Sequence, residues 1–140
     1  MALAESIFDD IAAHPKIWTS DVVPGSDPPT DPLIGRLAVG SVQVPQDLLH
    51  FWSVFGAGTL FETEEIYAPW SSLSELSSRV GALFERSLLP LHSGLSVTGL
   101  DPVDGVIVVV SGLARGHRFD SLDAWYRSVP REEFAGRYLA

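Results

Sequence analysis

Residues 98–110 read TGLDPVDGVIVVV, a run in which a turn separates two strand-forming segments. Residues 95–99 alternate apolar and polar side chains with the period of a strand. Aspartate, proline and glycine between Asp101 and Gly105 are typical of a turn. Residues 106–110 are all apolar and β-branched, as in a strand buried on both faces. The run therefore predicts a β-hairpin.

Helices are expected on both sides of this hairpin, wherever apolar residues recur at spacings of three and four. Proline suits the first turn of a helix, and Gly56 and Gly58 can end one in a left-handed conformation. Ser72 and Glu75 have the spacing of a capping box. The predicted helices are residues 3–14, a segment from Pro45 to Gly56, residues 72–87, and a segment that Asp120 caps and Pro130 closes.

The remaining segments complete a mixed architecture. Short strands are predicted at 60–61 and 66–67, and short extended segments within 33–44. The proline-rich residues 19–32 are predicted to form a loop. Phe134 and Tyr138 lie four residues apart and predict one more helical turn. Because helices and strands mix without strict alternation, the predicted fold class is α+β.

The composition indicates one folded domain over residues 1–140. The chain is 46% hydrophobic, 19% charged and free of cysteine, so we expect a packed core without disulfides or thiolate metal sites. Its longest run of branched apolar residues is five, far below the roughly 20 that a membrane helix needs. The first ten residues hold three acids and no base, unlike a secretory signal. We therefore expect a cytoplasmic protein that does not bind membranes.

The net charge of −9 comes entirely from the first half of the chain. Residues 1–75 hold eleven acidic and two basic side chains, whereas residues 76–140 hold seven of each. A negative field repels phosphate backbones, so we expect no direct binding of nucleic acid. The same field attracts a cationic protein and speeds the encounter. An acidic composition also serves solubility alone.

Motifs for catalysis and cofactor binding are weak. The four histidines, His14, His50, His92 and His117, lack metal-ligand spacing on one helical turn, although distant residues can meet in space. Residues 56–61, GAGTLF, begin like a dinucleotide-binding loop but lack its third glycine and follow a helix. We expect no catalytic residue, no cofactor and no metal.

A partner-binding surface is the more promising hypothesis. The acidic run at Glu62, Glu64 and Glu65 suits a basic partner, although charges also protect an edge strand from pairing. Exposed Trp and Tyr anchor interfaces, and Trp70 lies beside a turn segment where its ring could be exposed. Asp101 and Asp104 could share a cation, but forming the turn is the simpler role.

Three stretches together resemble the SUKH superfamily, the Smi/Knr-type domain. They are the proline-started helix and glycine turn at 44–58, the turn and strand at 98–110, and the aromatic-acidic helix start at 119–126. Their order matches the family, and with the first helix the likeness spans nearly the whole chain. Phe55 stands where members commonly have a polar residue, and Val106 where an acid often follows the strand's glycine. The chain thus resembles a divergent branch.

The resemblance implies an α+β domain with a twisted, mainly antiparallel sheet and helices packed around it. It also implies a non-enzymatic binding module. Many bacterial members resemble immunity proteins that neutralise a cognate toxin, often a nuclease, and others resemble regulatory scaffolds.

We therefore expect a protein-binding module, an immunity protein whose acidic surface covers a cationic toxin. The residues predicted to bind the partner are Glu62, Glu64, Glu65, Tyr67, Trp70, Asp101 and Asp104. The alternative is a scaffold or regulatory subunit in a stable assembly, with residues 134–138 docked into a neighbour. An enzyme of unrecognised type is a third hypothesis, but the sequence has no nucleophile–base or metal constellation that favours it.

Overall fold

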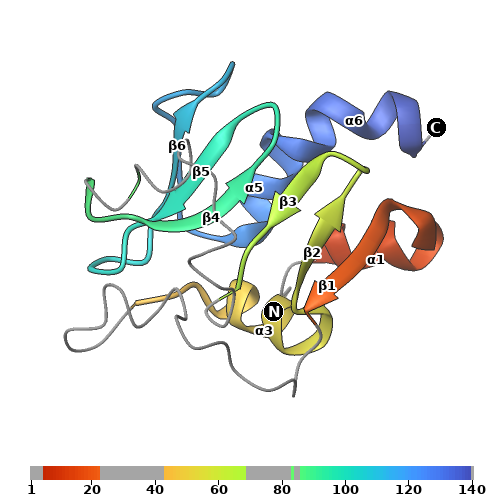
Figure 1. Cartoon of the computed structure of the whole chain (residues 1–140), viewed down its shortest axis with the longest axis horizontal. Helices are drawn as coiled ribbons and strands as arrows, with labels where there is room; N and C mark the ends of the chain where they lie inside the picture. Colours follow the sequence, from red (N-terminus) through yellow and green to blue (C-terminus); the bar gives the residue numbers. More distant parts are fainter. Residues whose placement is uncertain (1–4, 23–42, 69–82, 84–85, 140) are drawn as a thin grey trace.

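The computed structural model describes residues 5–22, 43–68, 83 and 86–139. These residues form a sheet with helices packed on it (Figure 1). The elements are α1 (Glu5–Ala13), η1 (Pro15–Ile17), β1 (Trp18–Val22), α3 (Gln46–Phe55), β2 (Ala57–Leu60), β3 (Glu64–Ile66), β4 (Leu89–Ser93), β5 (Val97–Leu100), β6 (Ile107–Ser111), β7 (Arg118–Phe119), α5 (Leu122–Ser128) and α6 (Pro130–Tyr138).

The seven strands of the described residues form one sheet in the order β1 to β7. Every neighbouring pair is antiparallel, so each strand pairs with the next strand along the described chain. The predicted hairpin is confirmed as β5 and β6, with Leu100 opposite Ile107. The α+β class is confirmed as well.

Helices cover one face of this sheet. Figure 1 shows α5 behind the strands, α6 next to the turn between β2 and β3, and α1 beside β1 and β2. The main core lies between these helices and the sheet, and Trp125 and Tyr126 of α5 are its largest fully buried side chains. A smaller cluster of Tyr67, Leu83, Leu88 and Val97 forms separately. Val97 alternates with Thr98, which contacts Trp125, so this cluster lies on the opposite face.

The predicted helix after Pro45 is confirmed, and Gly56 ends it as expected. Gly56 has φ 73°, and its N–H donates to the carbonyl of Trp52. The prediction for Gly58 was wrong, because this residue lies inside β2. A Cβ there would lie 2.2 Å from the carbonyl oxygen of Thr19 on β1, so close strand packing requires glycine at this position.

The last helices differ from the prediction at both ends. Ser121, not Asp120, is the N-cap of α5, and its hydroxyl accepts from the N–H of Ala124. α5 ends before Pro130, as predicted. Pro130 also begins α6, which has nine residues where one helical turn was predicted. Proline tolerates the first turn of a helix because it needs no N–H donor there.

Three strands were not predicted. β1 covers the first four residues of the predicted loop at 19–32, and β7 is only two residues long. β4 contains Pro90, which argues against a central strand, yet β4 lies between β3 and β5. A register shift between Pro90 and His92 accommodates the missing N–H. Most of the predicted segments at 33–44 and 72–87 lie outside the described residues.

A buried carboxylate joins the first and second halves of the chain. Asp47 of α3 is 5% exposed. Its two oxygens accept from the N–H groups of Leu122 and Asp123, each at 2.9 Å. These are free donors at the start of α5, where the helix dipole also favours a negative charge. Asp47 therefore fixes α3 against the start of α5.

We expect Asp47→Ala to lower the free energy of unfolding by about 1–3 kcal/mol, because it leaves two buried donors without an acceptor. Asp120→Ala is the matched control, since Asp120 is exposed and is not the cap. It should change stability by less than about 0.5 kcal/mol. Urea denaturation measures both, and equal effects of the two variants would contradict this role of Asp47.

Candidate protein-binding site

The turn between β2 and β3 has an unusual backbone. Phe61 and Glu62 have φ of 51° and 66°, the left-handed region that favours glycine. Each such residue costs about 1–3 kcal/mol, and the surrounding structure must hold it there. Backbone strain of this kind clusters at functional sites, which makes this turn a candidate site.

Aromatic packing holds the strained turn in place. The Phe61 side chain is fully buried. Its ring stacks on Phe134 of α6 at a centroid distance of 5.2 Å and lies 5.4 Å from the ring of Tyr138. The ring of Tyr126 of α5 is nearly parallel to that of Phe61 at a centroid distance of 6.3 Å. With Phe61 anchored inward, the turn presents Glu62 and Thr63 to solvent, and Glu62 is the charged one.

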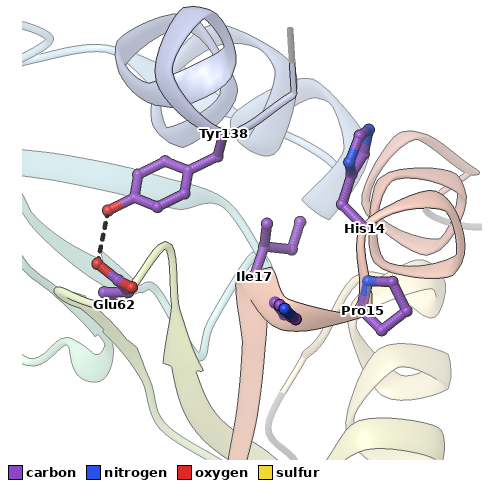
Figure 2. Close-up of a pocket in the computed structure, with 6 residues that line it drawn as sticks. His14, Pro15, Ile17, Glu62 and Tyr138 are labelled. Atoms are coloured by element: carbon purple, nitrogen blue, oxygen red, sulfur yellow. Dashed lines mark hydrogen bonds between the residues drawn. The ribbon is translucent and has the colours of Figure 1, made fainter.

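Glu62 lies at the edge of a pocket, and its carboxylate is held in position. The Tyr138 hydroxyl donates to a Glu62 oxygen at 3.0 Å. The pocket has a volume of about 400 Å³ and lies between the end of α1, the end of α6 and this turn. In Figure 2 the Tyr138 ring points at Glu62, with Ile17 beside them. The lining residues are His14, Pro15, Lys16, Ile17, Glu62 and Tyr138.

The pocket combines apolar walls with one carboxylate. Ile17 is buried at its base, and the Tyr138 ring and Pro15 add apolar surface. Two helix C-termini, α1 at Ala13 and α6 at Tyr138, end beside it and favour positive charge. A Lys or Arg side chain has the matching chemistry, an apolar stem with a cationic end. Lys16 also lines the pocket and repels an incoming cation. Attraction of a basic side chain therefore depends on the carboxylate of Glu62.

Glu64 does not belong to this surface, contrary to the prediction. It is 1% exposed and lies in a polar cluster beneath the sheet surface. Its carboxylate lies 3.0 Å from Nε2 of His92 and accepts from the Thr63 hydroxyl at 2.9 Å and from the Leu95 N–H. A Cβ on Gly94 would overlap this carboxylate, so the β4–β5 turn closes directly over Glu64.

The hydrogen bonds of this cluster form a chain that ends at Glu64. A carboxylate only accepts hydrogen bonds, so Nε2 of His92 donates to it. Thr98 lies 3.1 Å from Nδ1 of His92 and accepts from the Trp125 indole at 3.3 Å. Burial raises the pKa of Glu64, but the hydrogen bond and charge of His92 and the bonds from Thr63 and Leu95 outweigh it, so the pKa is lowered. Glu64 is therefore a structural anion.

Glu133 of α6 is a second carboxyl group near this cluster. One of its oxygens is buried and has no hydrogen-bond partner within the described residues. Burial, and then the negative charge of Glu64, raise its pKa. The two carboxyl groups thus shift in opposite directions, because the available donors all serve Glu64.

Glu65 and Tyr67 form a separate pair on the other face of the sheet. Glu65 is exposed, and the Tyr67 hydroxyl donates to it at 2.9 Å. Burial, followed by the hydrogen bond to Glu65, raises the pKa of Tyr67. Since Glu65 alternates with Glu64 along β3, the predicted glutamates do not share one surface.

Asp101 and Asp104 build the β5–β6 turn. The Asp101 carboxylate accepts from the N–H of Val103, and that of Asp104 from the N–H of Val106, each at 3.0 Å. Asp104 also pairs with Arg118 at 3.6 Å. This turn lies at the end of β5 opposite the β4–β5 turn, which closes over Glu64 beside the Glu62 turn. The structure therefore does not bring these aspartates to Glu62, and Trp70 lies outside the described residues.

Comparison with known proteins gives no relative for this chain. No family model, no curated protein and no solved structure matches it. Among the residues that the structure describes, no group of three His, Cys, Asp or Glu side chains could hold a metal ion. The described helices include none that is long and apolar enough to cross a membrane.

Sequence reasoning proposed Glu62 as a candidate site residue but did not predict its contact with Tyr138. The contact between Tyr138 and Glu62 joins residues 76 positions apart, so no local sequence pattern predicts it. His92 and Asp47 were also missed as buried polar groups, because charge along the chain does not reveal burial. The one available signal was Phe61, the apolar last residue of a predicted strand, directly before the glutamates.

We expect Glu62→Gly to be more stable to unfolding than Glu62→Ala by about 0.5–1 kcal/mol, because glycine adopts the left-handed backbone without strain. Both variants lose the hydrogen bond from Tyr138, so their difference reports on the backbone alone. Asp120→Gly and Asp120→Ala are the control pair. Asp120 has no positive φ, so glycine should be the less stable of the two there. Thermal and urea denaturation measure all four variants. A Glu62→Gly chain that is no more stable than Glu62→Ala would show that the turn is not strained.

The lowered pKa of Glu64 predicts a loss of stability in acid. A carboxylate with a lowered folded pKa stabilises the fold above its unfolded pKa, near 4.5, and this contribution is lost as the pH falls through the folded value. Glu64→Gln should therefore reduce stability at pH 7 and flatten its decrease below about pH 5. Urea denaturation between pH 7 and 3 measures this, with Glu65→Gln as the exposed control. Parallel curves for wild type and Glu64→Gln would contradict it.

Proposed function

We propose that this chain is a non-enzymatic protein-binding domain of the SUKH type, an immunity protein that covers the active surface of a cationic toxin. The observation that carries the proposal is Glu62, a carboxylate held by Tyr138 on a strained turn at the edge of an apolar pocket. A basic side chain of the toxin enters this pocket and pairs with Glu62. The nuclease class of toxin fits best, because such a protein carries cationic side chains for phosphate.

The geometry supports binding because the site is pre-organised. The Glu62 carboxylate needs no rearrangement to receive a cation, since the Tyr138 hydroxyl already orients it. Pre-organised groups lose less conformational entropy on binding. The left-handed backbone at Phe61 and Glu62 also costs folding free energy. Presenting the Glu62 carboxylate to a partner is a functional reason to retain this conformation.

Long-range charge supports the same partner. The chain carries a net charge of −9. Asp9, Glu62 and Glu65 are exposed acids of its first half within the described residues. Such a field steers a cationic protein to the surface and makes the association rate depend on salt. Close charge pairs across such interfaces reach coupling energies of about 1.5–7 kcal/mol.

The scaffold alternative loses its main support. The feature that would favour it is docking of residues 134–138 into a neighbouring protein. The side chains of Phe134 and Tyr138 instead pack on Phe61 of the same chain, and Phe134 is 7% exposed. Pulling them out would expose the aromatic core beneath the β2–β3 turn.

The test is capture of the partner from native lysate with the tagged chain and with Glu62→Arg. We expect one basic protein, retained by the wild type at low salt, weakened at high salt, and lost from Glu62→Arg by at least about tenfold. Asp120→Arg is the matched control, because it reverses another exposed carboxylate away from the pocket. Equal retention by all three chains, or a captured set that resists salt, would contradict the proposal.

A further inference from the structure

A second cavity lies toward the other edge of the sheet, at the turn between β6 and β7. It has a volume of about 390 Å³, and Arg86, Arg115 and Gly116 line it over a floor of residues 108–110. A Cβ added to Gly116 meets no atom within 4 Å, so this side of the turn faces open space. The proposed binding of a toxin through Glu62 does not use this cavity.

Its two guanidinium groups differ from others in the molecule. Arg118, Arg127 and Arg131 each pair with a carboxylate. Within the described part of the chain, Arg86 and Arg115 have no ion-pair partner, and no acidic side chain lines their cavity. Both are exposed. In a protein with twice as many acidic as basic side chains, this is a local reversal of charge.

Exposed apolar side chains lie in the turn that carries Arg115 and in the turn that touches it. Leu113, at the tip of the β6–β7 turn, is 98% exposed, and Leu95 in the β4–β5 turn is 63% exposed. The two turns touch, because a Cβ on Gly112 would lie 2.6 Å from the Ser96 Cβ. Arginine is enriched at protein interfaces, where it stands among apolar side chains.

We propose that this surface binds an acidic segment of a partner protein, one in which carboxylates alternate with apolar side chains. The planar guanidinium groups of Arg86 and Arg115 suit carboxylates, each of which can accept two parallel hydrogen bonds. The apolar side chains of the segment pack on Val110 and Leu113. The partner segment is thus opposite in charge to the one at Glu62.

The test titrates the ¹⁵N-labelled full chain with a synthetic peptide of alternating Glu and Leu residues. We expect amide shifts at residues 108–110 and 115–116, and a dissociation constant about tenfold weaker for Arg86→Gln/Arg115→Gln. Arg118→Gln/Arg127→Gln is the matched control. It makes the same change in net charge on guanidinium groups that already have partners, and should bind within about twofold of the wild type.

Three outcomes would overturn the proposal. The first is the absence of shifts at these amides. The second is equal weakening by both double variants, which would show only long-range charge. The third is inorganic phosphate producing the same shifts as tightly as the peptide, which would indicate a small-anion site. Unchanged amide positions elsewhere show that the variant is folded, so a loss of binding reports on the cavity.

Discussion

The hydrogen bond between His92 and the buried carboxylate of Glu64 is the constraint on which the centre of the sheet depends. It joins β3 to β4, and through Thr98 and Trp125 it extends to β5 and α5. A charge without partners in this position would be very costly, since Glu64 is 1% exposed. The β4–β5 turn must therefore place the Leu95 N–H on Glu64, and Gly94 must lack a side chain. One buried anion thus sets strand register, turn geometry and helix position together.

The same constraint shapes the neighbouring surface. β2 ends at Leu60, and Glu64 is the first residue of β3. The chain must therefore reverse its direction within residues 61–63. Phe61 enters the aromatic cluster of α5 and α6, and Glu62 is left exposed in a left-handed conformation. The burial of Phe61 and Glu64 thus holds Glu62, which lies between them, in a strained backbone conformation. In this conformation the Glu62 carboxylate lies at the pocket. The proposed function depends on this link between the core and the turn.

Charge is distributed over the fold in a way that the linear sequence only partly reveals. The acidic first half of the chain supplies Glu62, but it also supplies Asp47 and Glu64, which are internal anions that cap a helix or pair with His92. The second half is neutral along the chain, yet the cavity at Arg86 and Arg115 is basic. Net charge thus describes long-range attraction, whereas local recognition depends on which charges remain unpaired at the surface.

Local sequence patterns alone determined the α+β class, the β5–β6 hairpin, the helix that begins after Pro45 and its end at Gly56. These features depend on apolar period, turn residues and the conformational limits of proline and glycine, which act over a few neighbouring residues. Only the tertiary structure decided that Glu64 is buried, that Asp47 and not Asp120 reaches the start of α5, and that Tyr138 holds Glu62. The contacts that decide these features join residues far apart in sequence. Whether a carboxylate is a surface charge or an internal anion depends on donors that only folding brings to it.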